Sequence, residues 1–204
     1  YVWAVSISAD GEYIAAGSDD KKLYLFHKDS NDPLWIYDAD DDDEGSDEVR
    51  SVHLSDNGEY LTAATPSNVY FFNTSSNVPL WETEDGAGRN YKCGMSNDGK
   101  YVISVGRWGY ANLYDTSSGD LIWSYAPPKG IARVAISSYG DYIGISFADD
   151  DRNFSMFRKE YNIPLWTEEN AEIISMSADA KYIATGRGTL ASLLFDDQKH
   201  YAVS

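Results

Sequence analysis

Apolar and polar residues alternate along most of the chain, and the alternation starts anew five times. Val5 and Ile7 alternate with smaller or polar residues before the first turn. Equivalent pairs stand before four later turns: Val52 and Leu54, Cys93 and Met95, Val134 and Ile136, and Ile174 and Met176. A period of two residues is typical of β-strands, and no segment has the period of an amphipathic helix. The pattern predicts an all-β protein.

Each of these strands leads into a turn that ends on a tyrosine. The first turn reads Ser-Ala-Asp-Gly-Glu-Tyr over residues 8–13, and the tyrosines of the five turns are 47, 41, 41 and 40 residues apart. Asp-Gly and Asn-Gly supply the positive φ angle that tight hairpin turns need. Each turn therefore predicts a β-hairpin.

A third apolar strand and a short fourth strand with a tryptophan complete the unit, and the fifth unit lacks the tryptophan motif. Four strands in about 41 residues predict a blade of a β-propeller, in which neighbouring sheets bury each other's faces. The predicted blades of this single domain cover residues 1–37, 49–83, 90–125, 131–167 and 171–204. Five blades either close into a ring or form part of a seven- or eight-bladed ring. In an incomplete ring the terminal blades expose apolar faces, and we then expect self-association.

The sequence at residues 113–125, Leu-Tyr-Asp-Thr-Ser-Ser-Gly-Asp-Leu-Ile-Trp-Ser-Tyr, resembles the tryptophan docking motif of PQQ-like propeller repeats. The first two strands of each unit, with Ser-x-Asp-Gly-x-Tyr between them, resemble WD-type repeats. The combination of these two motifs in one repeat is similar to the PQQ/WD-like repeat proteins of archaeal and bacterial cell surfaces. The resemblance implies the propeller fold. The quinone enzymes with this repeat hold their cofactor beside a disulfide of adjacent cysteines, whereas this chain has only Cys93. We therefore expect no quinone cofactor.

The chain is strongly acidic, with 33 Asp and Glu against 16 Lys and Arg and a formal charge of −17. This charge disfavours nucleic acids and anionic membrane surfaces as partners. No apolar run is long enough to span a bilayer. The chain begins directly in a strand pattern at Tyr1, so we expect it to have been processed, trimmed or cut from a longer protein. The charge suits cationic partners or a high-salt setting. The glycosylation acceptor patterns at residues 73–75 and 153–155 and the resemblance to surface repeat proteins favour an extracellular, cell-surface or periplasmic location over the cytoplasm.

An acidic insertion at residues 38–48 separates the first two predicted blades. Carboxylates at alternate positions, with a glycine after them, suit calcium, which prefers hard oxygen ligands. The candidate ligands are Asp38, Asp40, Asp42 and Glu44. The alternative is a solvated acidic loop, because the full calcium-loop pattern is absent.

Several cations and one tryptophan are candidates for contact with a ligand or partner. Arg50, Arg89 and Arg133 fall near the starts of three predicted blades, where propellers often bind ligands. Charge compensation in an acidic protein is the alternative role for them. Arg107 and Trp108 lie in a glycine-bounded hairpin tip and do not recur in other units, as is typical of functional loop residues. The recurring tryptophans Trp35, Trp81, Trp123 and Trp166 are expected to pack blade against blade.

The sequence contains no pattern that indicates catalysis. The three histidines lie in different parts of different units, and no nucleophile-elbow or phosphate-loop motif is present. The leading hypothesis is a non-catalytic propeller module that binds a protein or a glycan. One alternative is a propeller-type enzyme, either a metal-assisted hydrolase or a degenerate quinone-dependent dehydrogenase. Another is a structural repeat region of a larger surface protein.

Overall fold

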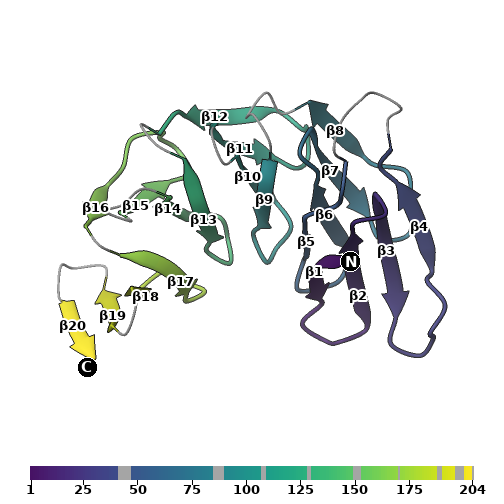
Figure 1. The fold of residues 1–204 in the computed structure, drawn as a ribbon, viewed down its shortest axis with the longest axis horizontal. Coiled ribbons are helices and arrows are strands. Elements are labelled where there is room, and N and C mark those ends of the chain that lie inside the picture. The colour runs from purple at the N-terminus through teal and green to yellow at the C-terminus, as the bar shows by residue number, and fades with distance from the viewer. Residues whose placement is uncertain are drawn as a thin grey trace.

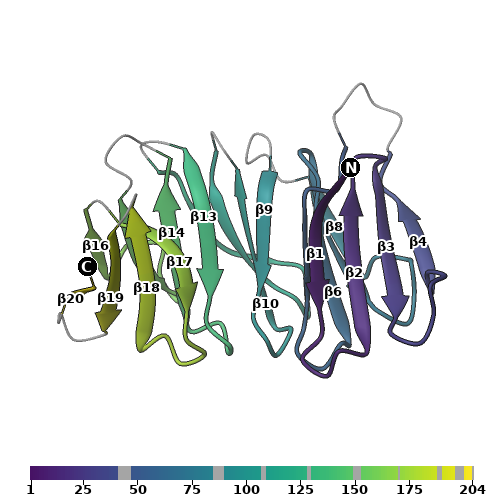
Figure 2. The same cartoon turned by 60° about the horizontal axis from the view of Figure 1, so that its bottom comes forward.

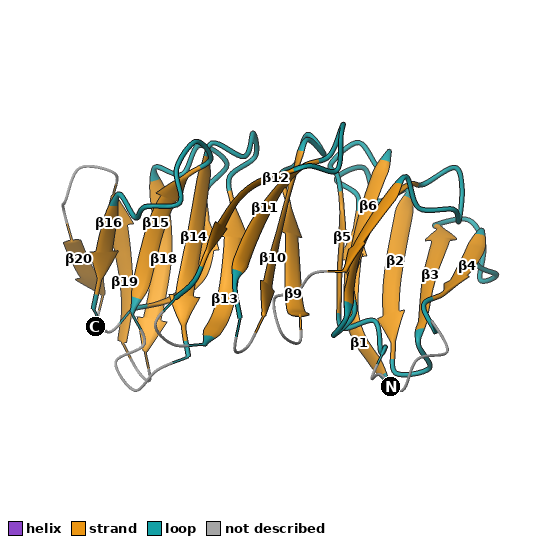
Figure 3. Ribbon diagram, turned by 90° about the horizontal axis from the view of Figure 1, so that it is seen from above, coloured by secondary structure: helices purple, strands orange, loops and turns teal. Residues whose placement is uncertain are grey.

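The computed structural model describes the chain with short gaps. The described ranges are residues 1–40, 47–84, 90–106, 109–127, 130–148, 153–169, 171–187, 190–195 and 200–203. Over these ranges the regular structure consists of β-strands in five four-stranded antiparallel sheets, and no helix is present (Figure 3). The prediction of an all-β propeller fold is confirmed. The described part therefore also contains no helix that is long and apolar enough to cross a membrane.

Each sheet is a meander of four consecutive strands, and we call each sheet a blade. Blade 1 comprises β1 (Val2–Ile7), β2 (Tyr13–Ser18), β3 (Lys22–His27) and β4 (Trp35–Asp38). Blade 2 comprises β5 (Ser51–Leu54), β6 (Tyr60–Ala64), β7 (Asn68–Asn73) and β8 (Trp81–Glu84). Blade 3 comprises β9 (Asn90–Met95), β10 (Tyr101–Gly106), β11 (Ala111–Asp115) and β12 (Leu121–Tyr125). Blade 4 comprises β13 (Ile131–Ile136), β14 (Tyr142–Phe147), β15 (Phe154–Arg158) and β16 (Trp166–Glu168). Blade 5 comprises β17 (Glu172–Met176), β18 (Tyr182–Arg187), β19 (Leu190–Phe195) and β20 (His200–Val203).

The five blades stand side by side along an open arc, with blade 1 at one end and blade 5 at the other (Figure 1). The first strand of each blade lies on the concave side of the arc and the fourth on the convex side. The hairpin turns between the first two strands of the blades line up along one edge (Figure 2). Of the two arrangements that the sequence left open, the closed five-bladed ring is not formed in this structure.

The apolar core lies between the blades. We call the face that a blade turns toward the preceding blade its leading face, and the opposite face its trailing face. Leu23 and Leu25 on the trailing face of blade 1 pack against Leu61, Tyr70 and Phe72 on the leading face of blade 2. Similar clusters join blade 2 to blade 3, blade 3 to blade 4 and blade 4 to blade 5. Each fully buried side chain of this kind contributes about 1.5–3 kcal/mol, so the interfaces hold the array together.

A contact between a glycine and a tyrosine recurs at three of these interfaces. A Cβ atom on Gly58, Gly99 or Gly140 would lie 2.6, 2.7 or 2.2 Å from the ring of the preceding blade's tyrosine. The three rings belong to Tyr13, Tyr60 and Tyr101. The glycines also have φ angles of +67° to +75°, a region that residues with side chains rarely adopt. Glycine is thus required at each of these turns for two reasons, the positive φ angle and the lack of space for a Cβ atom.

The recurring tryptophans add a hydrogen bond between neighbouring blades. The indole Nε1–H of Trp35 donates to the Thr74 carbonyl over 2.8 Å, and that of Trp81 donates to the Thr116 carbonyl over 3.0 Å. Trp123 makes the equivalent bond to the Lys159 carbonyl over 2.9 Å. Each tryptophan lies on the fourth strand of one blade, and each carbonyl follows the third strand of the next. These tryptophans therefore pack blade against blade, as their place in the repeat predicts.

Backbone and amide groups complete the docking between blades. At three interfaces the N–H of the second turn residue donates to the carbonyl of the equivalent residue in the next blade, as from Ala9 to Asp56 over 3.0 Å and from Ser138 to Ala178 over 2.9 Å. At the blade 3–4 interface the donor is the third turn residue, Asp98, whose N–H donates to the Ser138 carbonyl over 3.3 Å. On the convex side, the side-chain amide of Asn77 donates to the Ile36 carbonyl of the preceding blade over 3.2 Å. A backbone hydrogen bond between the turns thus joins the blades at each of the four interfaces.

The turn of blade 5 departs from this pattern. Ala180 stands where the other four turns have glycine, and its φ angle is +56°. A residue with a Cβ atom in this left-handed region raises the energy by roughly 1–2 kcal/mol. The fifth turn is therefore strained in a way that the others are not.

Substitution of the turn glycines separates backbone strain from contact with the neighbouring blade. We expect Gly11→Ala, with φ of +73° and nothing within 4 Å of its new Cβ, to lower the free energy of unfolding by about 1 kcal/mol. Gly140→Ala adds a collision with the Tyr101 ring, so it should cost a further ~1–3 kcal/mol. Urea unfolding of dilute protein measures the free energy of unfolding of both variants. An equal decrease in the two variants would contradict a close contact between Gly140 and the Tyr101 ring.

Relief of the strain in the fifth turn should stabilise the protein. We expect Ala180→Gly to raise the free energy of unfolding by about 1 kcal/mol, because glycine adopts a positive φ without strain. Ala178→Gly, two residues earlier in the same turn, is the matched control and should not raise the free energy of unfolding. Thermal unfolding followed by circular dichroism makes the comparison, and a lower midpoint for Ala180→Gly would refute it.

Candidate functional site

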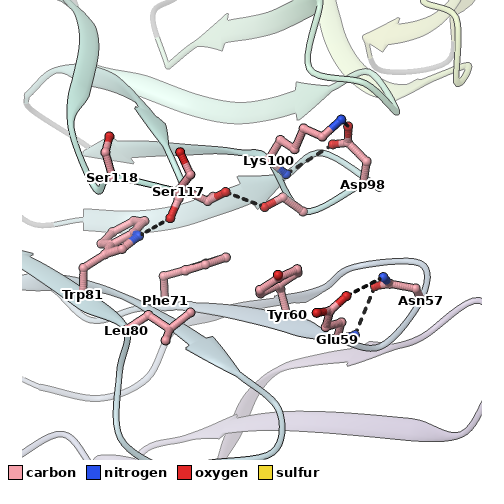
Figure 4. A pocket seen from close by; sticks show the side chains of 12 residues that line it. Asn57, Glu59, Tyr60, Phe71, Leu80, Trp81, Asp98, Lys100, Ser117 and Ser118 are labelled. Carbon is pink, nitrogen blue, oxygen red and sulfur yellow. Dashed lines mark hydrogen bonds and ion pairs between the residues drawn. The ribbon is translucent and has the colours of Figure 1, made fainter.

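A groove opens between blades 2 and 3, with a cavity volume of about 640 Å³. Blade 2 forms one wall and blade 3 the other (Figure 4). The lining residues come from hairpin turns and strand ends: Asn57, Glu59, Tyr60, Phe71, Leu80 and Trp81 from blade 2, and Asp98, Gly99, Lys100, Thr116, Ser117 and Ser118 from blade 3. We call this feature the blade 2–3 groove. Its volume suits a ligand group of the size of one or a few side chains.

Stacked aromatic rings form the blade 2 wall of the groove. The Phe71 ring lies 5.3 Å from that of Tyr60 and 5.3 Å from that of Trp81, with interplanar angles of 15° and 18°. Beside these rings the Leu80 side chain is 58% exposed. Register explains the stack, because Phe71 pairs with Trp81 across β7 and β8. Phe71 itself is only 1% exposed, so it supports the stack from behind. The partly exposed rings of Tyr60 and Trp81 together with Leu80 form the apolar surface of the wall.

The residue of blade 3 that lies beside the groove is shorter than its equivalent in blade 4. In blade 4, Lys159 extends over the Tyr101 ring of blade 3, with Nζ 5.0 Å from the ring centroid, and its Nζ lies 2.7 Å from Asp141. The equivalent residue of blade 3 is Thr116. Its hydroxyl donates back to the Gly99 carbonyl over 2.7 Å. No long side chain from this position crosses the blade 2–3 groove.

Charged groups lie on the rim of the groove. Asp98 accepts hydrogen bonds from the Ser96 hydroxyl at 2.7 Å and the Lys100 N–H at 3.2 Å, and the Lys100 Nζ lies 3.0 Å from it. Burial acts to raise the pKa of Asp98, but these bonds and the lysine charge outweigh it and hold the pKa below its usual value. Hydrogen bonding to Asp98 and its charge raise the pKa of Lys100. The pair is therefore fully ionised at neutral pH and largely compensates itself.

Glu59 leaves the rim with a net negative charge. The lining contains two carboxylates, Glu59 and Asp98, and one cation, Lys100. The Asn57 side-chain amide donates to Glu59 over 3.1 Å and fixes its position. A cationic group of a ligand therefore finds a carboxylate beside an apolar wall. No histidine or cysteine is among the lining residues.

Arg50, one of the predicted contact residues, lies at the start of blade 2. Its guanidinium carbon is 5.6 Å from the centroid of the Trp3 ring of blade 1, and its Nη2 is 3.3 Å from Glu48. The Trp3 indole donates to Asp19 over 3.1 Å. The structure thus brings Arg50 and Trp3 together and gives the arginine an intramolecular role. Contact of Arg50 with an external partner stays a prediction.

The other predicted contact residues are not brought to the groove. Arg133 lies on β13 with an exposed side chain. Arg89, Arg107 and Trp108 lie outside the described residues. Their roles as contact residues also stay predictions.

Two of the four candidate calcium ligands are described. The Asp40 carboxylate lies 2.8 Å from Lys21 Nζ, and the Asp38 carboxylate lies 3.6 Å from Lys22 Nζ. Asp42 and Glu44 lie outside the described residues. Within the described ranges, no group of three or more potential metal ligands is gathered. A calcium ion at the acidic insertion stays a prediction.

Part of the chain matches a known protein family. Residues 1–27 match the family model "WD domain, G-beta repeat". The match spans β1 to β3 of blade 1, including the Ser-x-Asp-Gly-x-Tyr turn, and so supports a WD-like propeller repeat. No curated protein matches the chain. The PQQ-like part of the resemblance stays a prediction.

Sequence reasoning did not find the blade 2–3 groove. Its tyrosine and tryptophan recur in the repeat and therefore do not stand out. One feature of the sequence points to the groove. Phe71 is aromatic, whereas the equivalent residues of blades 1, 3 and 4 are Leu25, Leu113 and Met156. Recognition of the open rim also required the contrast between Thr116 and Lys159, which has meaning only once the blades are aligned in space.

Proposed function

We propose that the chain is a non-catalytic propeller module that binds a segment of another protein in the blade 2–3 groove. The bound segment carries an apolar or aromatic side chain with a lysine or arginine beside it. The observation that carries the proposal is the stacked wall of Tyr60, Phe71 and Trp81 beside an exposed Leu80, bordered by the carboxylate of Glu59. The WD-like repeat supports the same class of function, a protein-interaction or scaffold module.

The chemistry of the groove favours a protein segment over a glycan. A sugar needs many hydrogen-bonding partners around each ring, whereas several polar groups here already bond to the protein itself. The Trp81 indole donates to the Thr116 carbonyl, and the Thr116 hydroxyl donates to the Gly99 carbonyl. An apolar side chain needs only the exposed carbon surface, and its burial drives association. The net charge of −17 also attracts a cationic segment over a longer range.

A screen with a display library of random peptides tests this proposal. We expect enrichment of peptides that place an aromatic or aliphatic residue next to Lys or Arg. Leu80→Asp should weaken binding of an enriched peptide at least about tenfold, because it puts a charge where an apolar side chain is buried. Binding of that peptide, measured by calorimetry, should also weaken as the salt concentration rises, because the Glu59 contact is screened.

The repeat itself provides the matched control. Leu165 precedes the tryptophan of blade 4 as Leu80 precedes that of blade 2, and it is 49% exposed. Leu165→Asp should leave peptide binding unchanged. Asp98→Asn is a second variant that should keep the fold. Asn57 occupies the same turn position in blade 2, and its side-chain oxygen accepts the same hydrogen bonds from the turn serine and from a backbone N–H. Failure to enrich any peptide, equal loss of binding in both leucine variants, or binding of a glycan array alone would contradict the proposal.

A further inference from the structure

The leading face of blade 1 is an uncovered apolar sheet face. Val5 and Ile7 on β1 are 70% and 62% exposed, whereas their equivalents on blade 2, Val52 and Leu54, are 3% and 8% exposed. Val2 is 64% exposed on the same blade. The partly exposed Tyr24 and Phe26 rings continue the face on β3, with centroids 6.3 Å apart. A contiguous apolar patch of this kind marks an interaction surface.

This face carries the same docking groups that the interior blades use. Gly11 occupies the turn position of Gly58, Gly99 and Gly140, but nothing lies within 4 Å of where its Cβ would be. The place of the tyrosine ring is therefore open. Lys28 stands at the position of Thr74, Thr116 and Lys159, whose carbonyls accept the indole bonds at the interior interfaces. Asn31 stands at the position of Asn77, whose amide reaches the preceding blade.

The trailing face of blade 5 is its complement. Tyr182 follows the fifth turn and is 49% exposed, and it is equivalent to the tyrosines that cover Gly58, Gly99 and Gly140 in the interior. Ala184 is partly exposed, whereas its equivalents Ala15 and Ile103 are fully buried. Tyr201 pairs with Leu193 and so takes the register position of the tryptophans. Blade 5 thus presents Tyr182 and Ala184 at positions that face the next blade in the interior interfaces.

We propose that the leading face of blade 1 docks on the trailing face of blade 5 of a second copy of this chain. The two faces belong to opposite ends of the arc and lie apart within one molecule (Figure 1), so the contact forms between copies. The occupant is identified by continuity with the four interior interfaces, each of which joins a leading face to a trailing face in this way.

The interface between blades 3 and 4 serves as the template in detail. There Gly140 lies under the Tyr101 ring, and Lys159 extends over that ring while its Nζ pairs with Asp141. Blade 1 repeats the same set with Gly11, Lys28 and Glu12, and the Lys28 Nζ already lies 3.5 Å from Glu12. Tyr182 of the second copy then takes the place of Tyr101. Lys28 gains a cation–π contact that it lacks in the single chain.

The contact joins two different surfaces, so it is heterologous. Interfaces of this type lead to closed rings if the rotation between copies closes and to open chains of copies if it does not. Association is therefore concentration-dependent and extends beyond a dimer unless a ring forms. The inference is independent of the blade 2–3 groove, which lies away from both ends of the arc.

Sedimentation velocity over a range of concentrations tests the contact. The unchanged protein should associate, and Val5→Glu with Ile7→Glu should weaken association at least about tenfold, because it would bury unpaired carboxylates. Val78→Glu with Ile163→Glu is the control. It adds the same charge at two apolar residues that are 67% and 70% exposed outside both faces, and association should remain.

A mixing experiment distinguishes the head-to-tail contact from other modes of association. Tyr182→Glu should block the trailing face, so neither this variant nor the Val5→Glu/Ile7→Glu variant should associate alone. Mixed in equal amounts, they should form a one-to-one dimer and nothing larger, because each copy keeps one intact face. The proposal is overturned by a wild-type protein that stays monomeric at high concentration, by variants that still associate alone, by a mixture that stays monomeric, or by equal weakening in the control.

Discussion

At three of the four interfaces, the contact between a turn glycine and the tyrosine of the preceding blade sets the geometry on which the docking of the blades depends. A four-stranded sheet alone leaves both faces exposed, so each blade must bury its faces against neighbours. The glycine brings the turn so close to the ring that Gly140 has no space for even a Cβ atom. With the turns aligned in this way, their backbone groups bond from blade to blade, and the tryptophans of the fourth strands meet carbonyls of the next blade.

The candidate site and the open end of the arc both follow from this repeated docking. Where the residue after the third strand is Lys159, its side chain covers the neighbouring tyrosine. Where it is Thr116, the blade 2–3 groove stays open beside the rings of Phe71 and Trp81. At blade 1 the docking groups are present without a blade to receive them. The blade 2–3 groove is thus a local variation of the interface, and the surface that we propose for association is a leading face with no blade packed against it in this structure.

Much of the fold was predictable because it repeats. Alternation at Val52 and Leu54 placed a buried strand, and the same pattern placed Cys93 among buried residues, where it is 2% exposed. The recurrence of the tryptophans correctly indicated packing between blades. Whether the array closes was not predictable, because closure depends on the rotation between neighbouring blades, which no local pattern records.

The candidate site was harder to predict for a related physical reason. Sequence reasoning selects residues that do not recur, such as Trp108, or clusters of like charge, such as the insertion at residues 38–48. The groove is instead built from recurring residues. It differs from the blade 3–4 interface at Thr116, where blade 4 has Lys159, and Phe71 stands where blades 1, 3 and 4 have no aromatic residue. Their significance depends on which side chain faces which groove, and that becomes visible only after the blades are placed next to each other.

Hydrogen exchange at the indole N–H groups, followed by NMR spectroscopy, tests the docking of blade on blade most directly. The indoles of Trp35, Trp81 and Trp123 donate to carbonyls of the next blade, so their exchange should be slow and should require separation of the blades. The Trp3 indole bonds to the exposed carboxylate of Asp19 and should exchange rapidly. Rapid exchange at all four indoles would contradict the account, because the blades would then not be held by the contacts described.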